Sequence, residues 1–259
     1  MDLGLNDRRA IVTGGSKGIG FAIARELLSE GAVVRICARN AGEVEAAVGR
    51  LGEGADGRVV DVRDAGQLND FVAWAAESMG GIDVLVNNAG GAHPGSFETL
   101  SDESLLADFN IKVHTWFRAV KAALPWLRQS PAPRVINIGS VYARMPDFRF
   151  FSTTVNRAAG LNLTKALAQE LAGDGILVNA VNIGSSRPRS GRTSTQNGHR
   201  RNQRRSSSRT WPPMRSPSPV SANRMRSRES WPSWQATGRV TSRAQASTSP
   251  AAWGATPEP

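Results

Sequence analysis

The chain has few residues of the types that build disulfides and metal sites. It contains one cysteine, Cys37, so it cannot form an internal disulfide or a cysteine-based metal site. Cys37 lies in the apolar run VVRIC, which favours a buried small hydrophobe over a reactive thiol. The three histidines, His93, His114 and His199, lack the spacing typical of metal ligands. We therefore expect no bound metal.

Long hydrophobic runs are also missing. No stretch reaches the roughly eighteen consecutive apolar residues that indicate a membrane-spanning helix. The opening residues, MDLGLNDRRAIVTGG, show no basic segment followed by an apolar one, which is the pattern of a secretion signal. We therefore expect a cytoplasmic protein with no membrane partner.

The net charge of +10 is unevenly distributed. From Ser185 onward there are 14 arginines, no lysine and two acids, whereas the preceding part has 18 basic and 20 acidic residues. A strongly basic chain would suggest nucleic acid as a partner. Because the first 184 residues are nearly neutral, we do not expect nucleic acid to be the partner of this protein.

The composition changes abruptly after Gly184. Residues 185–259 include no Leu, Ile, Phe or Tyr, but 16 serines and nine prolines. Such a segment cannot bury enough apolar surface to offset the entropy of ordering it. It is a native disordered tail, an RNA-binding segment or an out-of-frame translation. The sequence thus predicts one folded domain, residues 1–184, followed by an Arg/Ser/Pro-rich segment that is disordered or out of frame.

Within residues 1–184, short β-branched runs alternate with helical patterns. This alternation predicts an α/β fold with a Rossmann-like, doubly wound parallel sheet. We expect six strands, containing Ala10–Thr13, Val33–Cys37, Arg58–Asp61, Val84–Asn87, Val135–Ile138 and Ile176–Val181. Two long helices are expected over Ser101–Gln129, capped by Ser101 and bent by Pro125, and over Ser152–Leu171.

A glycine-rich turn, TGGSKGIG from Thr13 to Gly20, joins the first strand to the first helix. Glycines in such a turn let the backbone approach a pyrophosphate at the positive end of a helix. A tight turn without a ligand is the alternative, but the strand before it and the helix after it favour a dinucleotide. The predicted cofactor contacts are Gly14, Ser16, Lys17, Gly18, Ile19 and Gly20.

The spacing TGxxxGxG resembles that of the short-chain dehydrogenase/reductase family, in particular 3-oxoacyl-carrier-protein reductases. The motif NNAG, from Asn87 to Gly90, and the segment from Asn162 to Gly184 resemble the family as well, with Ile183 where proline is usual. The resemblance spans residues 1–184. It implies a nicotinamide dinucleotide cofactor and hydride transfer to or from a carbonyl or alcohol.

The resemblance assigns further residues to the cofactor. Asp61 and Val62 match the acid and amide that hold the adenine ring. Asn88, Ala89 and Gly90 match residues that steady the sheet and line the cofactor cleft.

The choice of cofactor depends on the end of the second strand. An acid there would bond the ribose 2′-hydroxyl and select NAD, whereas this chain has Arg39. Arg39 and Lys17 suit the 2′-phosphate of NADP, although Arg39 could also be a solvated surface residue. We therefore expect NADP rather than NAD.

The catalytic residues depart from the family pattern. Ser140 matches the substrate-orienting serine, and Asn110 matches the proton-relay asparagine. The family's catalytic tyrosine and lysine fall at Thr153 and Arg157, whether counted forward from Ser140 or back from Lys165. Proton transfer should therefore be impaired.

Chemistry explains why these substitutions matter. A phenol has a pKa near 10, which neighbouring positive charges can lower towards neutrality, whereas an aliphatic hydroxyl cannot be tuned so far. Arg157 keeps the positive charge and could clamp the ribose hydroxyls. Tyr142 is an alternative acid, although a packed or exposed aromatic after the strand is the favoured interpretation. A gapped alignment that places Phe151 and Val155 at these positions restores neither group.

The out-of-frame interpretation of residues 185–259 is favoured by the family's ending. If one base is missing after the Gly184 codon, restoring the frame turns ATGRVTSRAQASTSPAAWG into a string close to ASDRAGYITGASINVAGGLG. That string resembles the family's closing strand. The segment's tryptophans fit too, because a leucine CTG followed by G becomes TGG; they are Trp211, Trp231, Trp234 and Trp253.

The sequence thus predicts an NADP-preferring oxidoreductase acting on a small carbonyl or alcohol substrate. A homo-oligomer is implied by the resemblance. The alternative is a nucleotide-binding protein of the same fold with little turnover. Without the family's last strand and substrate loops, we expect poor stability and weak activity.

Overall fold

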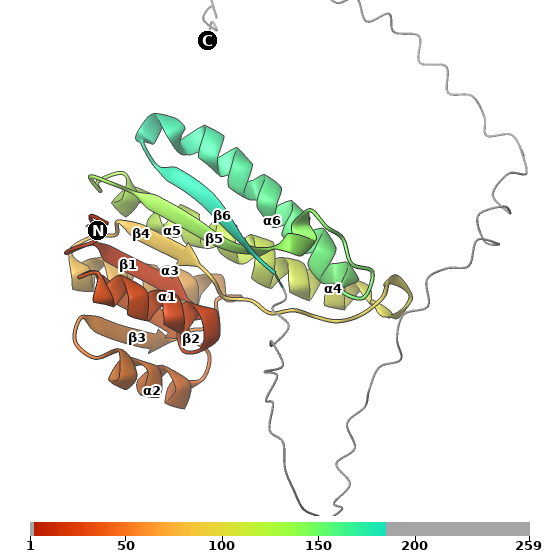
Figure 1. Cartoon of the computed structure of the whole chain (residues 1–259), viewed down its shortest axis with the longest axis horizontal. Helices are drawn as coiled ribbons and strands as arrows, with labels where there is room; N and C mark the ends of the chain where they lie inside the picture. Colours follow the sequence, from red (N-terminus) through yellow and green to blue (C-terminus); the bar gives the residue numbers. More distant parts are fainter. Residues whose placement is uncertain (1–2, 185–259) are drawn as a thin grey trace, which may run out of the picture. The chain divides into compact units, whose positions relative to one another are not determined.

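The computed structural model describes residues 3–184. Within this range six parallel strands form one sheet in the order β3-β2-β1-β4-β5-β6, with helices on both faces (Figure 1). The strands are β1 (Arg9–Thr13), β2 (Val33–Ala38), β3 (Ala55–Val59), β4 (Val84–Asn87), β5 (Arg134–Ser140) and β6 (Leu177–Ile183). The strand order reverses between β1 and β4, as in a doubly wound Rossmann sheet. The predicted fold class is confirmed.

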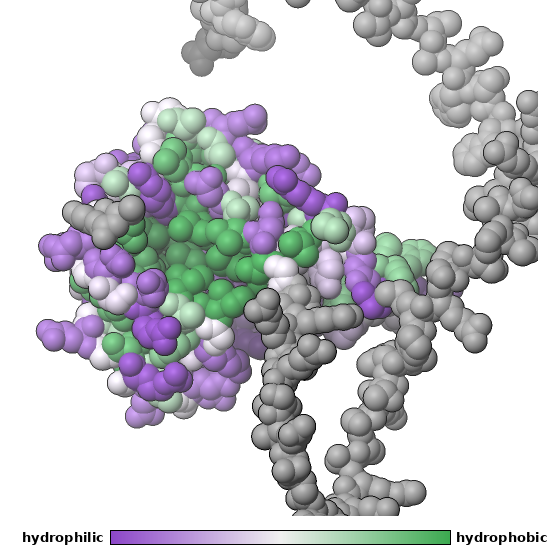
Figure 2. Space-filling view, in the orientation of Figure 1, coloured by the Kyte–Doolittle hydropathy of each residue, from purple (hydrophilic) through white to green (hydrophobic). Residues whose placement is uncertain are grey.

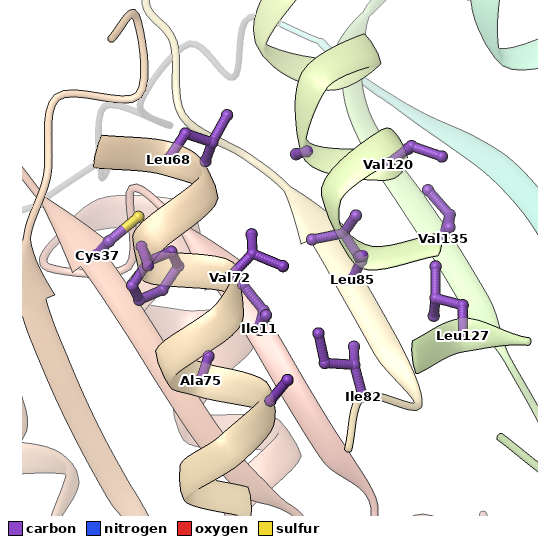
Figure 3. Close-up of a cluster of buried hydrophobic side chains, with 14 of the residues drawn as sticks. Ile11, Cys37, Leu68, Val72, Ala75, Ile82, Leu85, Val120, Leu127 and Val135 are labelled. Atoms are coloured by element: carbon purple, nitrogen blue, oxygen red, sulfur yellow. The ribbon is translucent and has the colours of Figure 1, made fainter. Parts of the chain in front are cut away.

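The alternation of side chains along the strands explains the two layers of helices. On β1, Ala10 and Val12 face α1 and α2, whereas Ile11 faces α3 and α5. Figure 3 shows the hydrophobic cluster around Ile11, where α3 and α5 pack on β1, β4 and β5. Cys37 is fully buried there, and burial raises the pKa of its thiol to about 12. The α-helices are α1 (Gly18–Ser29), α2 (Ala41–Leu51), α3 (Ala65–Met79), α4 (Asp102–Phe109), α5 (Thr115–Leu127) and α6 (Phe151–Glu170).

Strand β3 begins earlier than its apolar residues suggest. We predicted a strand over Arg58–Asp61, but the ladder with β2 starts at Ala55. The sequence ADGRV has no apolar alternation, because this edge strand is held by backbone hydrogen bonds. Gly57 lies against α2, where an added Cβ would stand 3.0 Å from a methyl group of Val44.

The helix predicted over Ser101–Gln129 is divided. Ser101 caps α4 as expected, since its hydroxyl accepts a hydrogen bond from the backbone N–H of Ser104 at 3.2 Å. A π-helical turn, Asn110–His114, then separates α4 from α5. A π turn holds one more residue than an α turn, so it changes which side chains face the rest of the fold. Short 3-10 turns lie at Phe97–Thr99, Val141–Ala143 and Leu171–Asp174.

The edge of the sheet at β6 is uncovered within residues 3–184. In this range β6 pairs with β5 alone, and Leu177 and Val181 on it are 50% and 51% exposed. Figure 2 shows apolar surface gathered over the strands between α1 and α6. Parallel sheets are ordinarily covered on both faces, so this face lacks its usual neighbours in the described part of the chain.

The predictions made for residues 185–259 lie outside the described residues. Among residues 3–184, no helix is both long and apolar enough to cross a membrane. The same residues contain no group of three or more His, Cys, Asp or Glu side chains that could hold a metal ion.

Candidate active site

A cleft of about 1390 Å³ opens at the carboxyl ends of the strands. Its walls come from the turn after β1, the segments after β2 and β4, the end of β5 and the start of α6. Ligands of open parallel sheets bind at this edge, next to the point where the strand order reverses. All the residues that the sequence assigned to the site line this cleft, except Asp61 and Asn110.

The glycine turn has the backbone that its sequence predicts. Gly14 has a φ of 65°, and an added Cβ would stand 3.0 Å from the Cα of Ala89. Gly18 has a φ of 58°, and an added Cβ would meet nothing within 4 Å, because it faces the open cleft. Glycine adopts such a φ without the steric cost that other residues carry. The turn is therefore free to receive a ligand close to its backbone.

Asn88 braces this turn from the neighbouring strand. Its side-chain amide donates to the carbonyl oxygens of Thr13 and Gly14, both at 3.0 Å. The Thr13 hydroxyl in turn accepts from the backbone N–H groups of Asn88 and Ala89, at 3.0 and 3.1 Å. These bonds fix the loop after β4 to the loop after β1, so both walls of the cleft keep their spacing.

Helix α1 points its amino terminus into the cleft. The first N–H groups of a helix have no partner within it and carry a partial positive charge. The first turn of α1 contains no acidic residue that would neutralise that charge. This end of the cleft therefore favours an anion such as a phosphate.

Two cations and one acid lie at the mouth of the cleft. The Lys17 ammonium donates to Glu43 at 2.8 Å, and the Ser16 hydroxyl donates to the same carboxylate at 3.4 Å. The hydrogen bond from Lys17 and the nearby charge of Arg39 hold the pKa of Glu43 below its usual value. Glu43 was not singled out from the sequence. Its place four residues after Arg39 was the available signal.

Asp61 does not line the cleft. Its carboxylate accepts two hydrogen bonds from the Nε of Arg63, at 2.9 and 3.1 Å, and this pairing lowers the pKa of Asp61. Val62, its predicted companion at the adenine ring, is buried and does line the cleft. The adenine contact of Asp61 remains a prediction.

Thr153 and Lys112 meet at the inner end of the cleft. Thr153 lies in the first turn of α6 and is only 3% exposed, yet it lines the cleft. Lys112 comes from the π turn, is fully buried, and donates its ammonium to the Thr153 hydroxyl oxygen at 2.8 Å. The backbone N–H of His93 donates to the same oxygen at 3.2 Å. Sequence reasoning placed Thr153 here but missed Lys112.

Asp108 holds this cluster together. Its carboxylate accepts from Lys112 and Ser152, each at 2.7 Å, and from Asn156 at 3.2 Å. It also lies 2.6 Å from Nδ1 of His93. Burial by itself would raise the pKa of Asp108, but these donors outweigh it and lower the pKa. The spacing of Asp108 and Lys112, one helical turn apart, was the only signal for the pair in the sequence.

Arg157 lies one turn beyond Thr153. One nitrogen of its guanidinium donates to the carbonyl oxygen of Ile138 at 2.8 Å, and its carbon lies 5.5 Å from the ring centre of Trp116. Its buried Nε has no hydrogen-bond partner among residues 3–184. Burial lowers the pKa of Arg157. An arginine with donors left over can still bond hydroxyl groups of a ligand.

Ser140 ends β5 on the cleft wall. Its hydroxyl oxygen accepts from the backbone N–H of Tyr142 at 3.3 Å. The Tyr142 ring is stacked on Phe150, with 5.3 Å between ring centres. Tyr142 is thus packed against an aromatic neighbour, as the favoured interpretation held, while one side of it still lines the cleft.

Asn110 is turned towards α5 instead of the cleft. Its side-chain oxygen accepts from Arg118 at 3.2 Å, and it does not line the cleft. Two residues later, Lys112 is the side chain of this turn that reaches Thr153. The relay role of Asn110 remains a prediction, and no direct contact between Asn110 and Thr153 supports it within the described residues.

Comparison with known proteins agrees with this architecture. The family described as short chain dehydrogenase matches residues 8–198. The chain is 33% identical over 185 residues to the 2,3-dihydro-2,3-dihydroxybenzoate dehydrogenase of Bacillus subtilis strain 168, covering 70% of this chain and 71% of that protein. It is 32% identical over 179 residues to a 3-oxoacyl-[acyl-carrier-protein] reductase of Vibrio harveyi, covering 69% and 73%.

Solved structures give the same result. A short chain oxidoreductase of Pseudomonas aeruginosa PAO1, described as containing an atypical catalytic center, is 34% identical in its apo form. Its TM-score is 0.68, and the match covers 70% of this chain and 71% of that one. An NADPH-bound structure with the same description is 34% identical with a TM-score of 0.66, covering 68% and 70%.

Proposed function

The chain belongs to the short-chain dehydrogenase family, and from that premise we propose that it transfers a hydride between NADP(H) and a small carbonyl or alcohol substrate. The domain responsible is residues 1–184. The observation that carries this proposal is the open glycine turn at the amino terminus of α1, joined by one cleft to the polar cluster around Thr153. A cytoplasmic location and a homo-oligomeric assembly belong to the same proposal.

The residues present fit a dinucleotide. Gly18 leaves room for a pyrophosphate beside the free N–H groups of α1. Lys17 and Arg39 at the mouth of the cleft suit a 2′-phosphate, which NADP carries and NAD lacks. The guanidinium of Arg157, which lines the cleft, suits the ribose hydroxyls next to the nicotinamide. The NADPH bound to the Pseudomonas aeruginosa relative supports the same preference.

When bound, the nicotinamide supplies or accepts the hydride, and the chain's own residues must hold the substrate and move the proton. Ser140, on the cleft wall, would hold the carbonyl oxygen through its hydroxyl. Arg157 would orient the cofactor from the other side. Asn110, predicted to organise water, would act from outside the cleft lining.

The test uses the full 259-residue chain. Titration with NADPH and with NADH, followed by quenching of tryptophan fluorescence, should show tighter binding of NADPH. NADPH oxidation across a panel of aldehydes and ketones should then show turnover. Equal affinity for both cofactors would overturn the NADP preference, and no binding of either would overturn the proposal.

The alternative, a nucleotide-binding protein with little turnover, is favoured by the absence of the family's phenol and amine at Thr153 and Arg157. NADPH binding without NADPH consumption across the whole panel would select it.

A further inference from the structure

We propose that Lys112 and Thr153 form a proton relay that protonates the substrate oxygen, in place of the tyrosine that the chain lacks at this position. The inference rests on the proposed function, because it describes how the same cleft completes carbonyl reduction. In this relay Thr153 contacts the substrate oxygen, and Lys112 supplies the proton.

The hydrogen bonds of Thr153 determine where its hydroxyl points. A hydroxyl has one hydrogen to donate and two lone pairs that accept. The ammonium of Lys112 and the backbone N–H of His93 can only donate, and they occupy both acceptor positions. The hydroxyl hydrogen has no acceptor among residues 3–184, and Thr153 lines the cleft. The remaining direction of donation is towards a ligand in the cleft.

The surroundings of Lys112 suit a proton donor. Its side chain is fully buried, and its ammonium reaches the Asp108 carboxylate as well as Thr153. Burial lowers the pKa of Lys112, Asp108 opposes this, and the charge of Arg157 on α6 adds to it. The ammonium therefore releases a proton more readily than that of an exposed lysine.

The step balances without any further reactant. As the hydride adds to the carbonyl carbon, the carbon–oxygen π bond breaks and its electron pair moves to oxygen. That oxygen takes the hydroxyl proton of Thr153, and the Thr153 oxygen takes a proton from Lys112. Lys112 is left as a neutral amine and regains a proton from solvent. Because both protons move together, no free threonine alkoxide forms, so the high pKa of an aliphatic hydroxyl is no obstacle.

The cluster also has a connection to solvent. The imidazole of His93 is bonded through Nδ1 to Asp108 and is 60% exposed. It joins the buried carboxylate beside Lys112 to the surface of the cleft. The charged or titratable groups around Lys112 are therefore Asp108 from α4, Arg157 from α6, and His93 through Asp108.

Variants of Thr153 in the full chain test the relay without disturbing the ion pair. Thr153→Val removes the hydroxyl but keeps the shape, and it should lower kcat about 100-fold, the scale of a lost general acid. NADPH affinity should not change. Thr153→Ser should restore kcat to within about threefold of the original.

Variants of Lys112 test the source of the proton. Lys112→Met alone leaves Asp108 buried without its cation, which can unfold the protein, so it is combined with Asp108→Asn. This pair should lose as much kcat as Thr153→Val, and adding Thr153→Val should cost little more, because the groups act as a unit. Lys121→Met, on the exposed face of α5, is the matched lysine control.

The pH dependence separates a relay from a structural role. Reduction requires the ammonium, so kcat should fall as the pH rises through the pKa of Lys112, and Thr153→Val should abolish that limb of the profile. The four lysines of the chain, Lys17, Lys112, Lys121 and Lys165, permit a direct measurement. NMR of lysine-labelled protein should show one amine titrating below the others, with its midpoint displaced by Thr153→Val.

The outcomes are distinct. If the chain reduces no carbonyl, the proposed function fails and the relay fails with it. If the chain is active and Thr153→Val keeps its full rate, only the relay is overturned. The same holds if the losses at Thr153 and Lys112 are additive, or if Tyr142→Phe alone abolishes activity.

Discussion

Lys17 and Glu43 form an ion pair, with 2.8 Å between Nζ and the carboxylate, at the mouth of the cleft where a 2′-phosphate would bind. The pair places a negative charge next to the cations that favour NADP. Both side chains are well exposed, so solvent weakens their attraction. Glu43 would therefore compete with a 2′-phosphate for Lys17 and would also repel it.

Removing that charge should strengthen NADPH binding. Glu43→Gln removes the negative charge but keeps a hydrogen-bond acceptor for Lys17 and Ser16, so the dissociation constant for NADPH should fall about three- to tenfold, with a smaller effect for NADH. Glu45→Gln, on the exposed part of α2, is the matched control. Fluorescence titrations at two salt concentrations measure the effect, which should shrink as salt rises. Unchanged NADPH affinity would place the 2′-phosphate elsewhere.

Gly18→Ala should separate cofactor binding from folding. The left-handed backbone at Gly18 costs an alanine about 1 kcal/mol, and no atom opposes its methyl group, so the protein should still fold. The methyl group would stand before the N–H groups of α1 and weaken NADPH binding about tenfold or more. Thermal melts and NADPH titrations, with Gly42→Ala as control, measure both effects. A Gly18→Ala protein with unchanged affinity would contradict the proposed phosphate site.

Stability should depend on Asp83 at low pH. Burial alone would raise the pKa of Asp83, but Arg9 and Ser130 donate to its carboxylate and lower the pKa from 3.8 to about 2. The carboxylate's contribution is therefore complete above about pH 4 and is lost as the pH falls towards 2, about 2 kcal/mol in all. Asp83→Asn should remove this part of the acid dependence and leave the part due to other carboxylates with lowered pKa values, such as Asp61 and Asp108.

Urea unfolding between pH 2 and 5 checks this prediction, with the exposed Asp70→Asn as control. If the Asp83→Asn protein loses stability over that range as steeply as the original, Asp83 is not the group responsible.

The edge of β6 should make the protein prone to self-association. Within residues 3–184, the outer edge of β6 pairs with no other strand, and Leu177 and Val181 on it are exposed, so this edge offers a place for another strand to pair. We expect a broad melting transition that depends on protein concentration, and light scattering that Val181→Lys reduces. A sharp melt, independent of concentration, would refute this expectation.

The coding DNA provides a separate test. If residues 185–259 are out of frame, the gene lacks one base after the Gly184 codon, and restoring it yields the family's closing strand. An intact frame through codon 185 would rule out this explanation.

Most of the fold followed from local pattern, because buried parallel strands are runs of β-branched residues. The strands around Val12, Val34, Leu85 and Val135 were predicted to within two residues at either end. The predicted position of strand β3 was shifted towards the carboxyl end, because ADGRV carries no such run. Its position is set by hydrogen bonds to β2, which are contacts distant in sequence.

The functional site likewise has one part that local sequence predicts and one part that depends on contacts distant in sequence. The glycine turn is local, so its motif could be read directly. The contact of Lys112 with Thr153 joins residues 41 positions apart and depends on a π turn that the helical periodicity did not reveal. Asn110 was chosen because it is an asparagine, the residue type that the family resemblance implied, whereas geometry favoured its neighbour Lys112.

The π turn makes the number of residues in the Asn110–His114 segment important for the site. One residue corresponds to about 100° of rotation around a helix. Deleting a single residue between Asn110 and His114 would restore regular winding and rotate α4 relative to α5 by that angle, so Asp108 on α4 and Trp116 on α5 could no longer both contact α6. The place of Asp108 against α6, and with it the proposed proton supply, thus depends on the number of residues in this turn as well as on their identity.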